Sequence, residues 1–188
     1  MSATRTTPLH ERHAALGASF TDFGGWDMPV RYTSDLAEHH AVRQAAGLFD
    51  ISHMAEFLVT GEGAGTFLDQ ALAGRISTMK AGKAKYSLLL TDAGGVLDDV
   101  IVYRLADERF HVISNAGNRE AVAAAFAERV RGHAADAAVE DVSDAYALIA
   151  VQGPRAPEIV ETTAGIADVA TALADLGYYA WSGGTFQG

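Results

Sequence analysis

Cysteine is absent from the 188 residues of this sequence, and proline occurs only four times. Without cysteine the chain can form no disulfide, no thiolate metal site and no iron–sulfur cluster of its own, and it has no cysteine nucleophile. Basic residues are also few, with 14 Lys and Arg against 24 Asp and Glu and a formal net charge of −10. This balance argues against a binder of nucleic-acid phosphates and against a polybasic membrane-surface protein. We therefore expect neither nucleic acid nor a membrane as partner.

Long hydrophobic runs are missing too. No apolar stretch approaches the ~20 residues that a membrane-spanning helix needs. The opening residues, MSATRTTPLHERHAALG, contain no apolar segment of the kind found in a secretory signal. What the chain does have is 49% hydrophobic residues, enough to bury a core, and a length that suits one domain or one and a half. The composition predicts a soluble, cytoplasmic protein of mixed helices and strands.

Cap and turn signals predict where the elements lie. Helices are expected after Pro8, from Ser34 to about Gly47, over 64–73 and after Asn118. From Tyr86 onward, YSLLL, VLDDVIVYRL and FHVISNA predict three antiparallel strands joined by short turns. The segment YALIAVQGP predicts a strand buried on both faces, because it is apolar throughout, and residues 167–176 predict one more helix.

Two adjacent carboxylates, Asp98 and Asp99, interrupt the apolar strand VLDDVIVYR. Side chains alternate along a strand, so Asp99 shares a face with Ile101 and Tyr103 while Asp98 points to the other face. Because both faces are apolar, at least one carboxylate should have hydrophobic surroundings, which a protein rarely keeps without a use or a partner. The alternative is that the strand begins later and both carboxylates belong to an exposed turn.

The histidines do not indicate a metal site. All seven lie outside any H-E-x-x-H pattern, and the adjacent pair His39 and His40 cannot both face one ion from a helix. Ser52 and His53 are neighbours in sequence, which is no sign of a catalytic dyad, because the partners of a triad meet in space. Residue patterns alone thus predict an acidic protein with one suspicious carboxylate and no metal.

Several segments together resemble one family. They are TPLHERHAALGASFTDFGGWDMPVRYTS, AVRQAAGLFDISHMAEFLVTG, KAKYSLLLTDAGGVLDDVIVYR, SNAGNRE and ALIAVQGPRAP. In order and spacing they resemble the aminomethyltransferase (T-protein) of the glycine cleavage system, from Thr7 to about Trp181. The resemblance implies a transferase of glycine catabolism. Such an enzyme passes a one-carbon unit from the aminomethyl-dihydrolipoyl arm of the lipoylated H-protein to tetrahydrofolate, giving 5,10-methylenetetrahydrofolate and ammonia.

The resemblance also assigns residues. The family's catalytic carboxylate is the second of the G-G-x-x-D-D segment, which is Asp99 here, and Asp98 is expected to matter much less. Folate-pocket positions matched by the family pattern are Met54, Leu58, Tyr86, Ile101 and Asn115. Ordinary core packing is an equal alternative for Met54, Leu58 and Ile101, and Asn115 could cap a helix, with or without a folate contact. Ala55 departs from the family, which has Gly in the S-H-M-G-E segment.

The fold implied by the resemblance is α+β, the folate-binding fold of this family. Residues 1–50 would form the N-terminal part of a first domain that also receives parts of 140–188. Residues 51–140 would form a ferredoxin-like second domain with an antiparallel sheet. The family's C-terminal half, with its G-Y-T-G-E-D-G-F-E segment, is absent from the sequence, so we expect a truncated chain that is inactive alone and exposes apolar surface.

Two other functions fit the same fold. One is a folate-dependent demethylase of the same superfamily, which would share the cofactor and accept a different donor. The other is a non-catalytic folate-binding or iron–sulfur-assembly accessory protein. The presence of Asp99 favours the transferase over the accessory protein, because a binding module has no need of that carboxylate.

Overall fold

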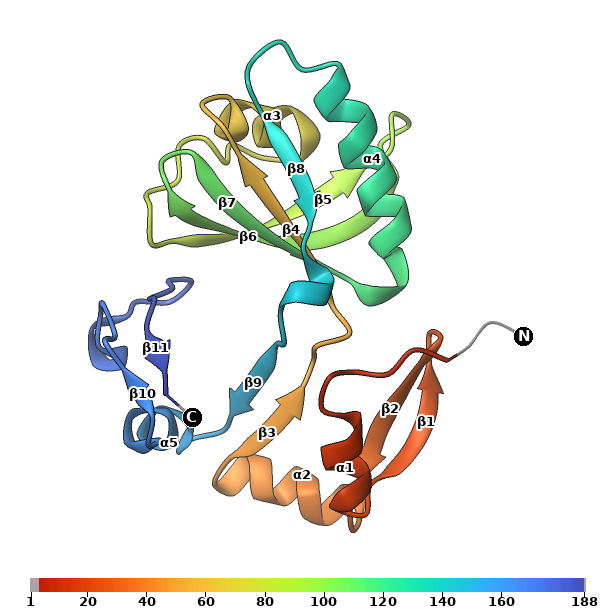
Figure 1. Ribbon diagram of the computed structural model, residues 1–188, viewed down its shortest axis with the longest axis vertical. Coiled ribbons are helices and arrows are strands. Elements are labelled where there is room, and N and C mark those ends of the chain that lie inside the picture. The colour runs from red at the N-terminus through yellow and green to blue at the C-terminus, as the bar shows by residue number, and fades with distance from the viewer. Residues whose placement is uncertain (1–3, 188) are drawn as a thin grey trace. The chain divides into compact units, whose positions relative to one another are not determined.

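The computed structural model describes residues 4–187, which fold as two compact units (Figure 1). Unit 1 comprises, of the described residues, 4–53, 147–175 and 183–187. Unit 2 comprises Met54–Tyr146 and Leu176–Ser182. None of the helices in the described part of the chain is long and apolar enough to cross a membrane.

Unit 2 is a five-stranded antiparallel sheet with two helices. Its strands follow the order β5-β6-β7-β4-β8 across the sheet. Their bounds are β4 Ala55–Thr60, β5 Ala84–Leu90, β6 Val96–Ala106, β7 Arg109–Ser114 and β8 Ala138–Asp141. The helices are α3 Ala64–Ala71 and α4 Arg119–Arg131, with short 3₁₀ turns at η1 Ala116–Asn118 and η2 Ser143–Ala145. The α+β class and the three strands predicted from Tyr86 onward are confirmed.

The core of unit 2 lies between one face of this sheet and both helices. Phe126 of α4 meets Phe57 of β4 edge-on at 5.6 Å between ring centroids and Phe67 of α3 at 6.0 Å. Leu68 of α3 and Val122 of α4 are fully buried in the same cluster. Along β6 the burial alternates, with residues 98, 100 and 102 buried and 99, 101 and 103 half-buried. The helices therefore cover one face, and we call the opposite face the open face.

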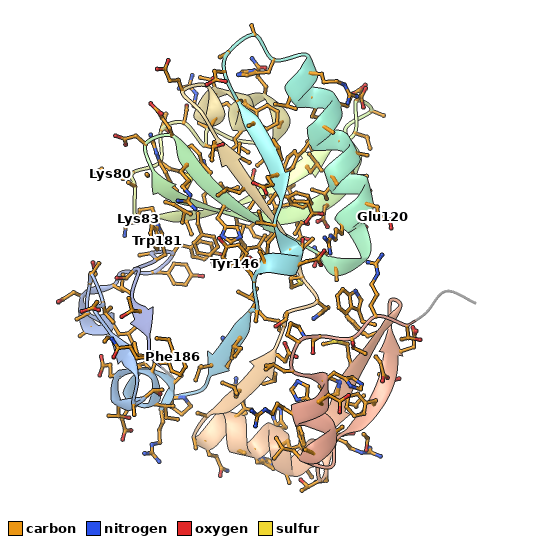
Figure 2. The ribbon with its side chains drawn as sticks, viewed as in Figure 1. Lys80, Lys83, Glu120, Tyr146, Trp181 and Phe186 are labelled. Carbon is orange, nitrogen blue, oxygen red and sulfur yellow. The ribbon has the colours of Figure 1, made fainter. Side chains whose placement is uncertain are left out.

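Residues 176–182 join unit 2 although they are distant in sequence from the rest of it. The Ala84 N–H donates to the Tyr179 carbonyl (2.8 Å), and the Trp181 N–H donates to the Gly82 carbonyl (3.1 Å). The Trp181 indole also donates to the Arg104 carbonyl (2.9 Å), and Trp181 and Lys83 lie at the same edge of the unit (Figure 2). β5 is at one edge of the sheet, and these hydrogen bonds pair backbone groups beside its start. Without them, those backbone groups would have to bind water.

Unit 1 consists of short elements and three two-stranded sheets. Its helices are α1 His10–Ala15, α2 Asp35–Gln44 and α5 Ala156–Thr162, with a 3₁₀ turn, η3, at Leu173–Asp175. The strand pairs are β1 Ser19–Phe23 with β2 Trp26–Arg31, β3 Gly47–Asp50 with β9 Ile149–Gln152, and β10 Ile166–Ala167 with β11 Thr185–Phe186. The predicted cap of α2 is confirmed, because the Ser34 hydroxyl accepts from the Ala37 N–H (3.2 Å).

Two predictions in unit 1 are wrong. The segment YALIAVQGP was expected to be buried on both faces, yet β9 pairs only with β3 among the described residues and Ile149 is 46% exposed. Residues 167–176 were expected to be helical, but Ala167 is in β10 and only Leu173–Asp175 forms a 3₁₀ turn. Asp168, at φ 52°, leaves the right-handed region directly after β10, which stops a helix from starting there.

A buried carboxylate connects three parts of unit 1. Asp50, at the end of β3, accepts hydrogen bonds from the Thr7 hydroxyl (2.6 Å) and the Ser52 N–H (3.0 Å). Nε2 of His13 lies 2.9 Å from the same carboxylate, and Nδ1 of His13 lies 2.7 Å from the Tyr32 hydroxyl. Burial opposes ionisation of Asp50, but the hydrogen bonds from Ser52, Thr7 and His13 outweigh it and hold the pKa of Asp50 below its ordinary value.

Acid should therefore destabilise unit 1 through Asp50. Because the folded-state pKa is lowered, the stabilising contribution is complete above the ordinary pKa of about 4 and is lost as the pH falls below it. Asp50→Asn should lower the free energy of unfolding at pH 7 by ~1.5–3 kcal/mol, as for a lost charged hydrogen bond, and should flatten this pH dependence. Urea unfolding followed by the fluorescence of Trp26 in a Trp181→Phe background measures both effects.

Asp35→Asn is the matched control, because that carboxylate belongs to the same unit and is 71% exposed. It should leave the urea midpoint nearly unchanged at pH 7. An Asp50→Asn variant that keeps the acid sensitivity of the parent chain would show that the Asp50 hydrogen bonds do not hold unit 1 together.

Candidate functional site

The open face of unit 2 gathers most of the residues singled out by sequence. In an antiparallel pair, opposed residues point to the same face, and Tyr86 is opposite Ile101 while Leu88 is opposite Asp99. Across β6 and β7, Ile101 is opposite Ile113 and Tyr103 is opposite His111. Side chains from β5, β6 and β7 thus share one surface, on which the apolar residues Ile101 and Ile113 lie beside polar groups.

Asp99 is one of these polar groups. The Tyr86 hydroxyl donates a hydrogen bond of 2.5 Å to Oδ2 of Asp99, and the Asn115 side-chain amide donates one of 2.9 Å to Oδ1. Each carboxylate oxygen thus has one fixed donor, which sets the plane of the carboxylate on the open face. The hydrogen bond to Asp99 is the main reason why the pKa of the Tyr86 phenol lies above its ordinary value.

The neighbouring carboxylate, Asp98, points to the covered face and is only 3% exposed. The prediction that the two carboxylates lie on opposite faces is confirmed, and the alternative of a shared exposed turn is wrong, because both lie within β6. Asn115 was also considered as a helix cap. It directly precedes η1 at the N-cap position, but its side chain makes no capping hydrogen bond and turns to the two carboxylates instead.

The three apolar candidates do not belong to the core cluster. Leu58 and Ile101 are half-buried on the open face, and Met54 is half-buried directly before β4. The register places Leu58 opposite His111 and Ile101 opposite both Tyr86 and Ile113, so both contribute to the same surface. Core packing, the other interpretation of these residues, is thus not what the structure shows for Leu58 and Ile101.

A second polar group on the open face, Glu56 with its neighbour His111, was not predicted from the sequence. Glu56 is 2% exposed, and its Oε2 lies 2.8 Å from Nε2 of His111. The two atoms are at ion-pair distance, but their geometry does not meet the angles of a hydrogen bond. The His111 ring is tilted against the ring of Tyr146 at 5.0 Å between centroids. Strand alternation could have found Glu56, because it stands two residues before Leu58 and must share its face.

Tyr179 was also missed, and its backbone is unusual. It adopts φ 50°, a left-handed conformation that costs a bulky side chain free energy and is concentrated at functional sites. The pKa values of the Tyr86 and Tyr103 phenols are both raised. The main cause is the hydrogen bond to Asp99 for Tyr86 and burial for Tyr103, and the Tyr179 phenol contributes less to both shifts. No sequence pattern signals this arrangement, because it depends on residues 176–182 returning to β5.

None of the described residues forms a metal site. Over residues 4–187, no group of three or more His, Asp or Glu side chains is arranged to hold an ion. The open face instead combines a fixed carboxylate, exposed or half-buried aromatic rings and aliphatic side chains. Such a surface suits a flat heteroaromatic ligand with polar nitrogen atoms on its edge.

Comparisons with known proteins agree on one family. Residues 9–188 match the family model described as the GCVT N-terminal domain. A curated aminomethyltransferase of Corynebacterium jeikeium is 49% identical over 199 aligned positions, which cover 100% of this chain and 51% of that protein. One of Saccharopolyspora erythraea is 51% identical over 180 positions, covering 96% of this chain and 47% of that protein.

A solved structure gives the same result. The glycine cleavage system aminomethyltransferase T from Bartonella henselae superposes with a TM-score of 0.80 at 41% sequence identity. The match covers 84% of this chain and 43% of that one. The chain thus spans about half the length of the curated relatives it matches.

The contact between Tyr86 and Asp99 predicts a titration. Asp99→Asn removes both the strong acceptor and the negative charge, so the raised pKa of the Tyr86 phenol should fall back toward its ordinary value of about 10. NMR of the chain labelled at tyrosine Cζ measures this ionisation directly, with Tyr86→Phe assigning the signal. The control is Asp107→Asn, whose carboxylate is 94% exposed in the turn after β6. An unchanged Tyr86 titration in Asp99→Asn would contradict the contact.

Proposed function

The chain belongs to the aminomethyltransferase family, whose N-terminal domain it carries over residues 9–188, and we propose that it supplies the folate-binding, catalytic part of such an enzyme. The reaction would transfer the one-carbon unit of the aminomethyl-dihydrolipoyl arm of the H-protein to tetrahydrofolate. Its products would be 5,10-methylenetetrahydrofolate, ammonia and the reduced lipoyl arm. Tetrahydrofolate is the acceptor, the lipoylated H-protein is the partner, and the compartment is the cytoplasm.

The observation that carries this proposal is the position of Asp99. Its carboxylate is held by two donors at the edge of an apolar surface that includes Ile101 and Leu58. A pterin can lie flat on aliphatic and aromatic side chains and direct its nitrogen atoms to a carboxylate. When the methylene group leaves sulfur for nitrogen, its carbon passes through an iminium-like state with positive charge. A fixed carboxylate stabilises this charge most strongly where water is excluded.

Tyr86 and Asn115 have separate tasks in this scheme. Tyr86 is 51% exposed, so its ring can stack on a ligand while its hydroxyl stays on Asp99. Asn115 is half-buried and fixes the second oxygen of the carboxylate. Met54, Leu58 and Ile101 would make apolar contacts with the folate. The fixed carboxylate favours a transferase over a folate-binding accessory protein, and a folate-dependent demethylase remains the second candidate because it would use the same surface.

Folate binding tests the surface. We define the family-length chain as residues 1–188 joined to the C-terminal half of the Corynebacterium jeikeium relative. Calorimetry on this chain should detect tetrahydrofolate binding, and Tyr86→Ala should weaken it by ~0.5–1.5 kcal/mol, roughly threefold to tenfold, through loss of an aromatic contact. Tyr178→Ala is the matched control, because that ring is 90% exposed. No binding at millimolar tetrahydrofolate would overturn the proposed function.

Turnover tests the carboxylate. Asp99→Asn is nearly isosteric but uncharged, so it should leave folding and folate binding largely intact and lower kcat of the family-length chain by ~10²–10⁴. Asp107→Asn should retain the parent rate. The assay measures methylenetetrahydrofolate formed from a lipoylated H-protein carrying the aminomethyl group. Residues 1–188 alone should show no turnover, since they lack half of the length of the active relatives. Full activity of Asp99→Asn would exclude an electrostatic role for Asp99.

A further inference from the structure

Asp98 is the most highly hydrogen-bonded carboxylate near the candidate site, although it cannot face a ligand there. It accepts from the Asn115 N–H (3.0 Å), the Asn115 side-chain amide (2.9 Å) and the Asn118 side-chain amide (2.6 Å). It is 3% exposed and lies on the face covered by the helices. A buried carboxylate is costly unless donors surround it, so these three contacts explain how it is tolerated.

The same contacts give Asp98 influence over Asp99. The Asn115 side-chain nitrogen lies 2.9 Å from an oxygen of Asp98 and 2.9 Å from an oxygen of Asp99. A side-chain amide has two hydrogens, so Asn115 can give one to each carboxylate, and the backbone carbonyl of Asp99, 3.3 Å from the same nitrogen, shares the hydrogen on the Asp99 side. With its backbone N–H also bound to Asp98, Asn115 is held at two points on the covered side of β6. It therefore presents its remaining hydrogen to the open side in one direction.

We propose that Asp98 is a positioning residue for the transfer reaction, acting through Asn115 to orient the Asp99 carboxylate. The inference rests on the proposed function for its catalytic consequence, whereas the link from Asp98 through Asn115 to Asp99 is a property of the chain itself. It replaces the expectation that Asp98 matters little because strand alternation points it away. Alternation does separate the two carboxylates, but Asn115 reaches both.

The link requires a carboxylate at position 98. An ionised aspartate only accepts hydrogen bonds, and its two oxygens serve the three donors of Asn115 and Asn118. An asparagine there would direct its own NH₂ group at one of these donors, leaving that donor unpaired or pushing it away. Asp98→Asn should therefore release Asn115 and, through it, one of the two donors that hold Asp99.

The first experiment reads the link through Tyr86, which donates to the other oxygen of Asp99. In the chain labelled at tyrosine Cζ, Asp98→Asn and Asn115→Ala should each shift the Tyr86 phenol titration. The charge of Asp98 also raises the pKa of Tyr86 directly, so the link is measured as the difference between two shifts. Asp98→Asn should shift the titration less when Asn115 is already Ala, because the amide that connects the carboxylates is gone and only the direct charge effect is left. Asn118→Ala is the matched control, since it removes a donor to Asp98 but none to Asp99.

The outcomes are distinct. If Asp98→Asn shifts the Tyr86 titration equally with Asn115 present and with Asn115→Ala, or if Asn118→Ala shifts that titration as much as Asp98→Asn does, the link through Asn115 is absent and the proposal is wrong. If Asp98→Asn does not fold, amide exchange in the unmodified chain still tests the link from Asp98 through Asn115 to Asp99. The two Asn115 side-chain amide protons of that chain should be resolved and slow to exchange, and rapid exchange of both would overturn the link.

The second experiment measures catalysis in the family-length chain. Asp98→Asn should lower kcat by ~10–10², the loss expected from misplacing a catalytic group, with KM for tetrahydrofolate changed less than about threefold. An unchanged kcat with a shifted Tyr86 titration would overturn the positioning role. A parent chain that binds folate but shows no transfer, together with an intact link in the NMR experiment, would instead contradict the proposed function.

Discussion

The alternation of side chains along β6 is the constraint on which the candidate site depends. Because neighbouring residues of a strand point to opposite faces, Asp98 and Asp99 must separate, one into the covered side and one onto the open face. Neither carboxylate is left without partners. Asn115, from the end of β7, donates to both and thereby couples a buried anchor to an accessible carboxylate.

The coupling works because unit 2 holds β6 and the segment after β7 rigidly. On the covered face, Phe57, Phe67 and Phe126 pack edge to face beneath the strands, and close-packed interiors transmit small displacements rather than absorb them. The open face bears neither α3 nor α4 and can therefore carry polar groups beside half-buried aliphatic residues. One sheet thus has the core of unit 2 on one side and the candidate site on the other.

Much of this could be predicted from residue patterns. Cap signals located α2 at Ser34, turn signals located β5, β6 and β7, and period-two alternation separated Asp98 from Asp99. The failures have separate causes. The double burial of the strand around Ile149 was inferred from local apolarity, which does not tell how many neighbouring strands it will find, and the helix expected over 167–176 is interrupted by the left-handed backbone of Asp168. Those elements belong to unit 1, whose sheets have only two strands.

The sequence by itself determined the family, the α+β class that the resemblance implies, and the face on which Asp99 lies, because motif order and strand periodicity are local or one-dimensional properties. Only the tertiary structure decided that Asn115 joins the two carboxylates, that Glu56 meets His111, and that residues 176–182 return to β5 with Tyr179 in a left-handed conformation. Each of these contacts joins residues at least 16 positions apart in the chain. Hydrogen bonds of that kind depend on which strands become neighbours, and sheet order is fixed by packing of the whole unit rather than by any single segment.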